Sequence, residues 1–309
     1  MNPLKTIVCG AGFWGKFWLK AVDASTDMSL VAIVARRLEA LRQVGQKYDL
    51  PSNALFTDLE LAVEEAQADL VVVVTPPACH LEHIRTAVKA GVHVICEKPS
   101  ADTLEAAQKI AALVRSHPEQ KFMVSQTRRF TDQVHTLHEV IASGKIGQID
   151  TITFDHRVNY TGGGYRQHMD YPVIEDMICH HLDTLRYITG QEPVSVYTEV
   201  WNPAWSQFCG KASNNVLATM TNGIHVNYFG SWTSRGQLND YDGVMKVMGS
   251  KGSLDLVDAN TLKFYSNTNM ETGPNPEPET IALLRLKHRE IEGVIKAFVG
   301  ALQTRRLRQ

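Results

Sequence analysis

The first 125 residues alternate short apolar runs with stretches of helical period. Each apolar run has the length of a strand, and in each stretch that follows, apolar residues recur every three or four positions. Continuous apolar strands separated by helices are typical of a parallel sheet that is covered on both faces. The predicted strands are Thr6–Cys9, Leu30–Ala35, Leu70–Val74, His93–Cys96 and Phe122–Ser125. The predicted helices are Phe17–Asp23, Leu38–Tyr48, Asp58–Ala66, His80–Ala90 and Leu104–Ser116.

The pattern changes after about residue 126. A helical stretch, Gln133–Ser143, precedes strands that follow one another, and several of these alternate apolar and polar residues, which indicates an antiparallel sheet with one covered face. Further helical stretches cover Val173–Thr189 and Arg285–Leu302, and the segment Asn269–Glu279, rich in Pro, Asn and Glu, is predicted to be a loop. The predicted strands are Ile149–Val158, Val194–Trp201, Val216–Met220, Ile224–Trp232, Val244–Gly249 and Ser253–Val257.

These patterns predict an α/β protein of two domains. Residues 1–125 form a doubly wound parallel sheet of the Rossmann kind, and residues 126–309 form an α+β domain with a large open, mainly antiparallel sheet. A length of 309 residues agrees with two domains of about 150 residues each. The apolar fraction of 44% and the charged fraction of 21% are those of an ordinary soluble globular protein.

Charge and cysteine usage exclude several classes of protein. A formal net charge of −2 argues against a nucleic-acid partner, whose backbone requires an excess of Lys and Arg. No apolar run approaches the roughly 18 residues of a membrane helix, and the strand Thr6–Cys9 lies where a signal peptide would be. The five cysteines are odd in number and form no CxxC pair, which indicates thiols in a reducing compartment. We therefore expect a cytoplasmic protein with no membrane partner.

A glycine-rich turn follows the first predicted strand. Gly10-Ala11-Gly12-Phe13-Trp14-Gly15 is a GxGxxG sequence between a strand and a helix, which is the context that a dinucleotide site requires. Gly10 permits the tight turn, Gly12 lets the backbone approach a pyrophosphate, and Gly15 lets helix and strand pack closely. Amides at the start of the helix, from Phe13 and Trp14 onward, can donate to the phosphates.

The end of the second strand indicates which dinucleotide binds. An NAD site usually has Asp or Glu there, to hold the ribose 2′-hydroxyl. This chain has Val34-Ala35-Arg36-Arg37, without a carboxylate and with two guanidinium groups. Arginine suits a 2′-phosphate, so we predict NADP(H), with NAD(H) as the alternative. In that alternative the two arginines only begin a solvated helix.

Two further motifs lie at the carboxyl ends of predicted strands, where ligands of such sheets bind. Thr75-Pro76-Pro77 follows the third strand, and its two prolines end the strand and fix the backbone. Glu97-Lys98-Pro99 follows the fourth strand. A lysine at the end of a buried strand is seldom structural, since an apolar residue serves there more easily.

With these motifs the chain resembles the glucose–fructose oxidoreductase, inositol dehydrogenase and rhizopine catabolism (Gfo/Idh/MocA) family. The resemblance covers nearly the whole chain, and its motifs come in the expected order. They are the glycine turn, Thr75-Pro76-Pro77, His80, Glu97-Lys98-Pro99, Arg128-Arg129-Phe130, Ala142-Ser143-Gly144-Lys145-Ile146-Gly147 and Asp176-Met177-Ile178-Cys179-His180-His181-Leu182-Asp183.

The resemblance implies a pyridine-nucleotide oxidoreductase that acts on a sugar, a polyol or a related carbonyl compound. Lys98 matches the family's active-site lysine, and Asp176 and His180 match the Asp and His of its second-domain helix. Independently, Asp176 and His180 are four residues apart and share one face of a helix. Histidine titrates near neutral pH and suits a proton shuttle, while a lysine ammonium can polarise a carbonyl oxygen.

The site residues follow from the motifs and the resemblance together, with Arg166 added because Tyr165-Arg166 resembles the family's aromatic–arginine pair. We expect the cofactor at Gly10, Gly12, Phe13, Trp14, Gly15, Arg36, Arg37, Thr75, Pro76, Pro77, His80, Glu97 and Lys98. We expect the substrate at Lys98, Arg166, Asp176 and His180.

Two departures from the family pattern bear on the substrate. Tyr171-Pro172-Val173-Ile174-Glu175 stands where the family usually has a glycine cluster, and Ile178 stands where it commonly has glycine. The bulkier side chains of this segment, which precedes Asp176, are expected to narrow the pocket or to select a different substrate.

Three alternatives to a dehydrogenase remain open. Helically spaced pairs such as Cys79 with His83, or His135 with His138, could ligate zinc, but no set completes a site and we predict no metal. The same fold could serve a regulatory protein that senses NADP(H) or sugar, in which case loss of Lys98 or His180 would be expected. A tightly bound cofactor without net redox turnover is the third alternative.

The open sheet predicts an oligomer. Trp201, Tyr228 and Trp232 are expected on its uncovered face, and exposed apolar faces of this kind are usually covered by a partner. We therefore expect a homodimer or homotetramer through this sheet.

Overall fold

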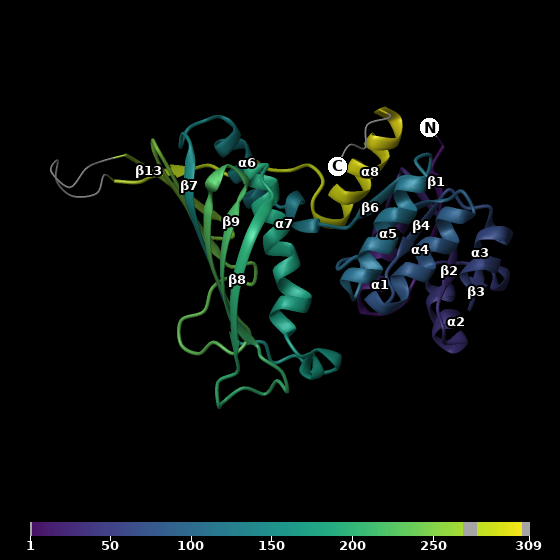
Figure 1. The fold of residues 1–309 in the computed structure, drawn as a ribbon. Coiled ribbons are helices and arrows are strands. Elements are labelled where there is room, and N and C mark those ends of the chain that lie inside the picture. The colour runs from purple at the N-terminus through teal and green to yellow at the C-terminus, as the bar shows by residue number, and fades with distance from the viewer. Residues whose placement is uncertain (1, 268–276, 305–309) are drawn as a thin grey trace. The chain divides into compact units, whose positions relative to one another are not determined.

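The chain folds into two compact units in the computed structural model, which describes residues 2–267 and 277–304 (Figure 1). The first unit comprises residues 1–127 and 288–309, and the second comprises residues 128–287. Most of the predicted loop Asn269–Glu279 lies outside the described residues, and Glu279 begins a strand. The predicted α/β class is confirmed.

The first unit is built on a six-stranded parallel sheet with the strand order β3-β2-β1-β4-β5-β6. This is the order of a Rossmann fold, in which the chain reverses direction across the sheet between β1 and β4. The strands are β1 (Leu4–Cys9), β2 (Met28–Val34), β3 (Leu55–Phe56), β4 (Leu70–Val73), β5 (His93–Cys96) and β6 (Phe122–Val124). The helices that follow are α1 (Phe13–Asp23), α2 (Leu38–Lys47), α3 (Leu59–Ala66), α4 (His80–Lys89) and α5 (Leu104–Ser116).

The C-terminal helix α8 (Glu290–Thr304) belongs to this first unit, whereas the sequence assigned residues 126–309 as a whole to the second domain. Phe298 of α8 is fully buried, with its ring centroid 6.3 Å from that of His93 at the start of β5. Lys296 Nζ lies 2.7 Å from Asp27 Oδ2. An amphipathic pattern shows which face of a helix is apolar but not which sheet covers that face, so the sequence missed this return of the chain.

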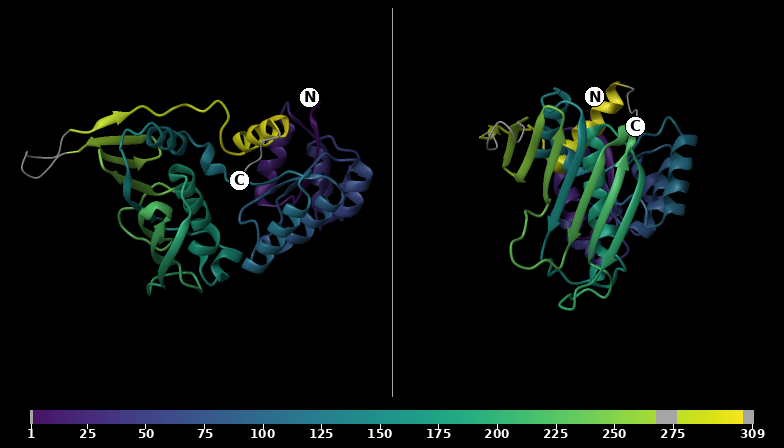
Figure 2. Two further views of the ribbon diagram at one scale, coloured as in Figure 1. Left: turned by 45° about the horizontal axis from the view of Figure 1, so that its top comes forward. Right: turned by 60° about the vertical axis from the view of Figure 1, so that its left-hand side comes forward.

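The second unit is built on an eight-stranded sheet with the strand order β14-β13-β12-β11-β7-β10-β9-β8, seen nearly face-on in the right-hand view of Figure 2. Neighbouring strands are antiparallel except β7 and β10, which are parallel, so the mainly antiparallel sheet is confirmed. The strands are β7 (Ile149–Arg157), β8 (Pro193–Trp201), β9 (Ser213–Met220), β10 (His225–Ser231), β11 (Val244–Gly249), β12 (Gly252–Asp258), β13 (Thr261–Ser266) and β14 (Glu279–Ile281).

One face of this sheet is covered by α6 (Asp132–Ala142) and α7 (Ile178–Thr189). Leu137 of α6 and Leu185 of α7 pack against inward-facing strand residues such as Ile152 and Val247, and all four are buried. The predicted helix Val173–Thr189 is not α-helical throughout. It begins with a π-helical turn, Val173–Met177, after which the Ile178 amide donates to the Val173 carbonyl five residues back.

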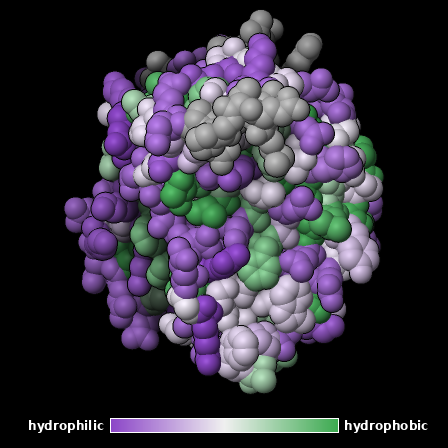
Figure 3. Space-filling model, turned by 90° about the vertical axis from the view of Figure 1, so that its left-hand side faces the viewer, coloured by the Kyte–Doolittle hydropathy of each residue, from purple (hydrophilic) through white to green (hydrophobic). Residues whose placement is uncertain are grey.

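The other face of the sheet carries exposed side chains from neighbouring strands (Figure 3). Tyr197 of β8 and Leu217 of β9 are paired in register, and their exposed fractions are 67% and 53%. Tyr228 and Trp232 are not on this face, in contrast to the prediction, because both are buried at 4% and 0%. The alternation of β10 places Tyr228 on the same side as the core residue Val226, which turns both toward the helices.

Candidate nucleotide-binding and catalytic sites

The glycine turn has the geometry that a close backbone approach requires. Gly10 has φ = +121°, and a Cβ atom there would lie 2.5 Å from the Val74 carbonyl oxygen. A Cβ at Gly15 would lie 2.1 Å from the Gly10 carbonyl oxygen, so glycine is needed for the packing of α1 on this turn. At Gly12, the N-cap of α1, a Cβ would meet no atom within 4 Å.

The first turn of α1 is suited to a phosphate. Its amides have no intrahelical acceptors, and it contains no acidic residue to repel an anion. The open space at Gly12 is on the side from which a pyrophosphate would approach. The side chains of Phe13 and Trp14 are exposed beside it, with ring centroids 5.7 Å apart. The chemistry of this turn therefore fits a dinucleotide.

A cavity of about 200 Å³ lies beyond the carboxyl ends of β1, β2 and β4. Arg36 lines it, whereas Arg37 forms the exposed N-cap of α2. Thr75 lines the cavity as well. The full lining is Cys9, Val34, Ala35, Arg36, Thr57, Asp58, Leu59, Glu60, Thr75, Glu82, His83 and Thr86.

The buried Glu97 carboxylate ties α1 to the loop that carries Lys98. The Trp18 indole N–H donates to Glu97 Oε1 at 2.8 Å, and the Lys98 amide donates to Oε2 at 3.1 Å. Trp18 is fully buried, while the Lys98 side chain is half-buried. Because protein donors engage both carboxylate oxygens, we interpret Glu97 as a residue that positions Lys98. The sequence did not reveal this partner, since Trp18 lies 79 residues away.

His80 connects the loops after β4 and β5. Its Nε2 lies 2.7 Å from the Thr75 carbonyl oxygen, and its Nδ1 lies 3.1 Å from the Pro99 carbonyl oxygen. Burial lowers the pKa of His80, although these carbonyl contacts act in the opposite direction. His80 is fully buried, so its observed role is to hold these two loops together. Pro76 and Pro77 begin the short helical turn that leads into α4, and Pro76 is exposed.

In the second unit, Asp176 lies in the π-helical turn and is paired with Arg166. Arg166 Nε donates to Asp176 Oδ2 at 2.8 Å, and Nη2 donates to Oδ1 at 3.5 Å. Burial disfavours the charged guanidinium, but the hydrogen bond and charge of Asp176 raise the pKa of Arg166 overall. The Tyr165 ring centroid lies 4.9 Å from the guanidinium carbon. The structure therefore joins the predicted substrate residues Arg166 and Asp176.

His180 and its neighbour His181 both lie on α7. Both side chains are buried. His181 Nδ1 lies 2.9 Å from the Tyr228 hydroxyl, and its ring packs on Phe154 with centroids 4.4 Å apart. His181 thus packs against the covered face of the sheet. Successive residues of a helix point about 100° apart, so His181 need not share the role of His180.

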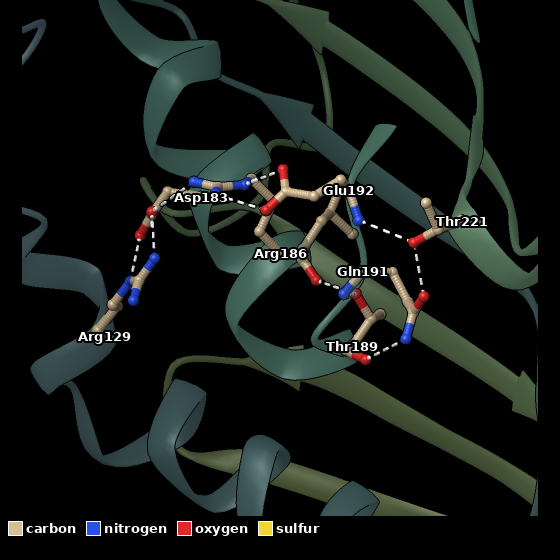
Figure 4. A network of polar contacts seen from close by, with 8 residues as sticks. Arg129, Asp183, Arg186, Thr189, Gln191, Glu192 and Thr221 are labelled. Carbon is tan, nitrogen blue, oxygen red and sulfur yellow. Dashed lines mark hydrogen bonds and ion pairs between the residues drawn. The ribbon is translucent and has the colours of Figure 1, made fainter. Parts of the chain in front are cut away.

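A polar network fixes α7 to the segments around it (Figure 4). Arg129 donates to both carboxylate oxygens of Asp183, at 2.7 and 2.6 Å. Arg186 donates in the same bidentate way to Glu192, at 2.7 and 2.6 Å. The Glu192 amide then donates to the Thr221 hydroxyl at 3.1 Å, which connects the end of α7 to the turn between β9 and β10.

Further buried polar groups lie on the covered face of this sheet. The His156 side chain is fully buried, and among the described residues neither ring nitrogen has a hydrogen-bond partner. Burial, with a smaller contribution from Arg128, lowers the pKa of His156 to about 4. The Tyr241 ring centroid lies 6.2 Å from that of His156.

The structure gives no support for a metal site. Within residues 2–267 and 277–304, no three His, Cys, Asp or Glu side chains are grouped so that they could hold an ion. All five cysteines are free thiols, of which Cys9 and Cys96 are buried and Cys209 is exposed. Over the same residues no helix combines the length and the hydropathy needed to cross a membrane.

Two family models match the chain, and the boundary between them lies close to the boundary between the two units of the structure. Residues 4–126 match the model of the Gfo/Idh/MocA oxidoreductase family with an NAD-binding Rossmann fold. Residues 134–255 match the model of a Gfo/Idh/MocA C-terminal domain.

Similar proteins include both uncharacterised proteins and named dehydrogenases. The uncharacterised protein y4oX of Sinorhizobium fredii is 30% identical over 262 residues, which are 82% of this chain and 72% of that protein. Inositol 2-dehydrogenase of Corynebacterium glutamicum is 26% identical over 73% of this chain and 66% of that enzyme. The crystal structure of an Agrobacterium radiobacter oxidoreductase in complex with NAD+, L-tartaric acid and magnesium has a TM-score of 0.83 at 20% identity, covering 97% and 89% of the two chains.

Proposed function

The chain belongs to the Gfo/Idh/MocA family of oxidoreductases, and from this membership we propose that it transfers hydride between NADP(H) and a sugar, a polyol or a related carbonyl compound. The observation that carries the proposal is the glycine turn, where backbone amides and open space meet at the first turn of α1. The inositol 2-dehydrogenase relative supports the substrate class.

The choice of NADP(H) rests on the end of β2. Arg36 lines the cavity there, and the last residues of β2 provide no carboxylate for a ribose 2′-hydroxyl. The Agrobacterium radiobacter structure contains NAD+, so a protein of this fold can bind NAD(H), and we propose that in this chain the residues lining the cavity select NADP(H). The bound nicotinamide supplies hydride chemistry, and the protein supplies binding and proton transfer.

We propose that Lys98 and His180 carry the proton transfer. In the oxidation direction His180 accepts the hydroxyl proton, and in reduction it returns the proton. The ammonium of Lys98 polarises the substrate oxygen, and Glu97 fixes the backbone from which Lys98 extends. Asp176, oriented by Arg166, binds a substrate hydroxyl. The roles of Lys98 and His180 follow from the family motifs that these two residues match.

The experiment that tests this function is a titration of the purified protein with NADPH and NADH, followed by quenching of tryptophan fluorescence. We expect tighter binding of NADPH in the wild type. In Arg36→Ala the advantage of NADPH should fall by about 10- to 100-fold, since a hydrogen bond to a charged group contributes about 1.5–3 kcal/mol. Arg37→Ala is the matched control within the pair, because Arg37 does not line the cavity.

The other outcomes of the titration are equally informative. Equal or tighter binding of NADH would overturn the NADP(H) assignment and leave the oxidoreductase proposal with NAD(H). Turnover is then measured with inositols and aldoses and the preferred cofactor. Nucleotide binding without turnover of any of these would favour a sensor, and cofactor released only on denaturation would favour a tightly bound cofactor without net turnover.

We also propose that the exposed face of the second sheet forms a homo-oligomer interface. Tyr197 and Leu217 provide apolar area on adjacent strands, and the rings of Trp201 and Phe229 lie beside them with centroids 6.1 Å apart. Exposed apolar faces of this kind are typical of subunit interfaces.

A further inference from the structure

The cavity at the end of β2 contains a histidine for which the proposed function has no role. His83 belongs to α4 and lines the same cavity as Arg36 at the end of β2. The side chain is half-buried. No nucleotide-binding motif in the sequence includes it, and it lies eight residues after Thr75 on a different element.

The orientation of the His83 ring is fixed by Thr75. His83 Nδ1 lies 3.0 Å from Thr75 Oγ1, and the Thr75 carbonyl is held in turn by His80 Nε2 at 2.7 Å. A hydroxyl can both donate and accept, so this bond persists whether the ring is neutral or protonated. Among the described residues Thr75 is the hydrogen-bond partner of this ring. Nε2 is therefore the atom of His83 that is left to donate to a ligand in the cavity.

Three carboxylates line the same cavity, those of Asp58, Glu60 and Glu82, and two of them are already engaged. Asp58 caps α3, where its Oδ1 accepts from the amides of Glu60 at 2.8 Å and Leu61 at 3.1 Å. Glu82 forms an ion pair with Arg85, which follows it on α4. Arg36, in contrast, has no ion-pair partner among the described residues. The groups of the lining that attract an anion are thus the Arg36 guanidinium and the His83 imidazole, whereas the exposed Glu60 carboxylate at the start of α3 acts against one.

We propose that His83 acts with Arg36 to recognise the 2′-phosphate of NADP(H), and that protonation of His83 makes the binding of 2′-phosphorylated nucleotides depend on pH. This inference rests on the proposed nucleotide site and goes beyond it, because it assigns a second specificity-determining residue. A protonated imidazole donates a charge-assisted hydrogen bond to phosphate, which is stronger than a neutral one.

The direction of the pH dependence follows from the surroundings of His83. Burial, followed by the nearby His80, lowers the pKa of His83, whereas Glu82 and Asp58 act in the opposite direction. Without a ligand, the His83 imidazole is therefore mainly neutral near pH 7. A bound phosphate promotes protonation of this imidazole. Burial raises the pKa of the Cys9 thiol to about 12, so this residue stays uncharged. The charged and titratable groups that face the cavity with His83 are Arg36, Asp58, Glu60, Glu82 and Cys9.

The test compares two ligands that differ only in the 2′-phosphate. Calorimetric titrations of the full chain with 2′,5′-ADP and with 5′-AMP are made from about pH 5 to about pH 8, the range in which histidine titrates. In the wild type we expect 2′,5′-ADP to bind more tightly than 5′-AMP. In His83→Gln the Kd for 2′,5′-ADP should increase by about 5- to 20-fold at the acidic end, since the charged hydrogen bond is lost.

Two controls isolate the effect of His83. The phosphate itself takes up a proton near pH 6, and the pH dependence that remains in His83→Gln shows how far that titration alone changes binding. His117→Gln replaces a histidine of the same unit that does not line the cavity, and it should bind both ligands as the wild type does. Unchanged 5′-AMP binding in His83→Gln would show that the site is intact.

The outcomes distinguish this inference from the proposed function. If the wild type prefers 2′,5′-ADP and His83→Gln retains both the preference and its pH dependence, the role of His83 is wrong and the NADP(H) assignment stands. Equal losses for both ligands in His83→Gln also overturn that role. If the wild type shows no preference for 2′,5′-ADP, the NADP(H) assignment fails together with the inference. If neither ligand binds, the proposed nucleotide site itself is wrong.

Discussion

Lys98 illustrates how single residues of this chain are placed for chemistry. The Glu97 carboxylate receives the Trp18 indole and the Lys98 amide, and Trp18 belongs to the same helix whose first turn faces the glycine loop. A buried carboxylate is costly unless its oxygens are hydrogen-bonded, so this arrangement persists only while both donors remain. The backbone of Lys98 is thereby held to the element that is proposed to bind the pyrophosphate.

At this scale the proposed proton transfer predicts a loss of kcat. Lys98→Met and His180→Gln should each lower kcat by about 10²- to 10⁴-fold, the range that positioned acid–base groups contribute. If the two groups act together, the double variant should be little worse than either single variant. The measurement is the steady-state rate with the substrate found in the turnover screen, at saturating nucleotide. His138→Gln, a part-exposed histidine on α6, serves as the control. A kcat within threefold of the wild type in either variant would remove that residue from the mechanism.

At the scale of elements, α7 is held by two bidentate ion pairs that differ in burial. Arg129–Asp183 involves a buried carboxylate, whereas both partners of Arg186–Glu192 are exposed. Exposed pairs contribute about 0–1 kcal/mol, whereas removing one partner of a buried pair leaves an uncompensated charge. The buried pair should therefore dominate the stability of the helix that carries His180.

This difference is measurable by hydrogen exchange of the α7 amides. We expect Arg129→Ala to lower their protection by about 10- to 100-fold, which corresponds to the cost of removing both hydrogen bonds from a buried carboxylate that then keeps, among the described residues, only Arg186, at 3.9 Å. Glu192→Ala should lower it by less than about fivefold. Equal effects of the two variants would show that burial of the Asp183 carboxylate does not set the strength of this anchor.

Local sequence patterns predicted the bounds of those elements that are marked by their own residues. The bounds predicted for β5 and α5 agree with the structure, because apolar runs and a capping threonine mark them directly. Three strands were missed, namely β3, β13 and β14. Strand β3 has two residues and β14 has three, too few for an apolar pattern to mark, and each is stabilised by pairing with another strand of its sheet. The π-helical turn before α7 was also missed, as the spacing of apolar residues does not distinguish one inserted residue.

The candidate site likewise contains features that local motifs predict and contacts that only the fold brings about. The glycine turn and Arg36 were predicted as cofactor residues from motif and position, and the structure places Arg36 in the lining of a cavity. The contacts Trp18–Glu97, Arg166–Asp176 and Thr75–His83 join segments that only the fold brings together, so no local pattern indicated these pairs.

At the scale of the whole molecule, each of the two units has its own sheet and core. The first unit is made of two chain segments, because α8 returns to it after the second unit is complete. Its sheet is parallel, and helices follow its strands. The sheet of the second unit is covered by α6 and α7 on one face, and the opposite face exposes apolar side chains. This asymmetry confines the prediction of self-association to the second unit.

The final prediction is that this face holds copies of the chain together. Its edge strand β8 exposes Val196 and Tyr197, whose side chains point to opposite faces of the sheet, and Leu217 extends the apolar area to β9. We expect sedimentation equilibrium to show a dimer or tetramer of the wild type at micromolar concentration. The double variant Tyr197→Glu/Leu217→Glu should sediment as a monomer, because opposing copies would then bury like charges. Leu104→Glu changes a leucine of the first unit that is more exposed than Leu217, and it should leave the mass unchanged. A monomeric wild type, or a double variant with the mass of the wild type, would contradict an interface at this face.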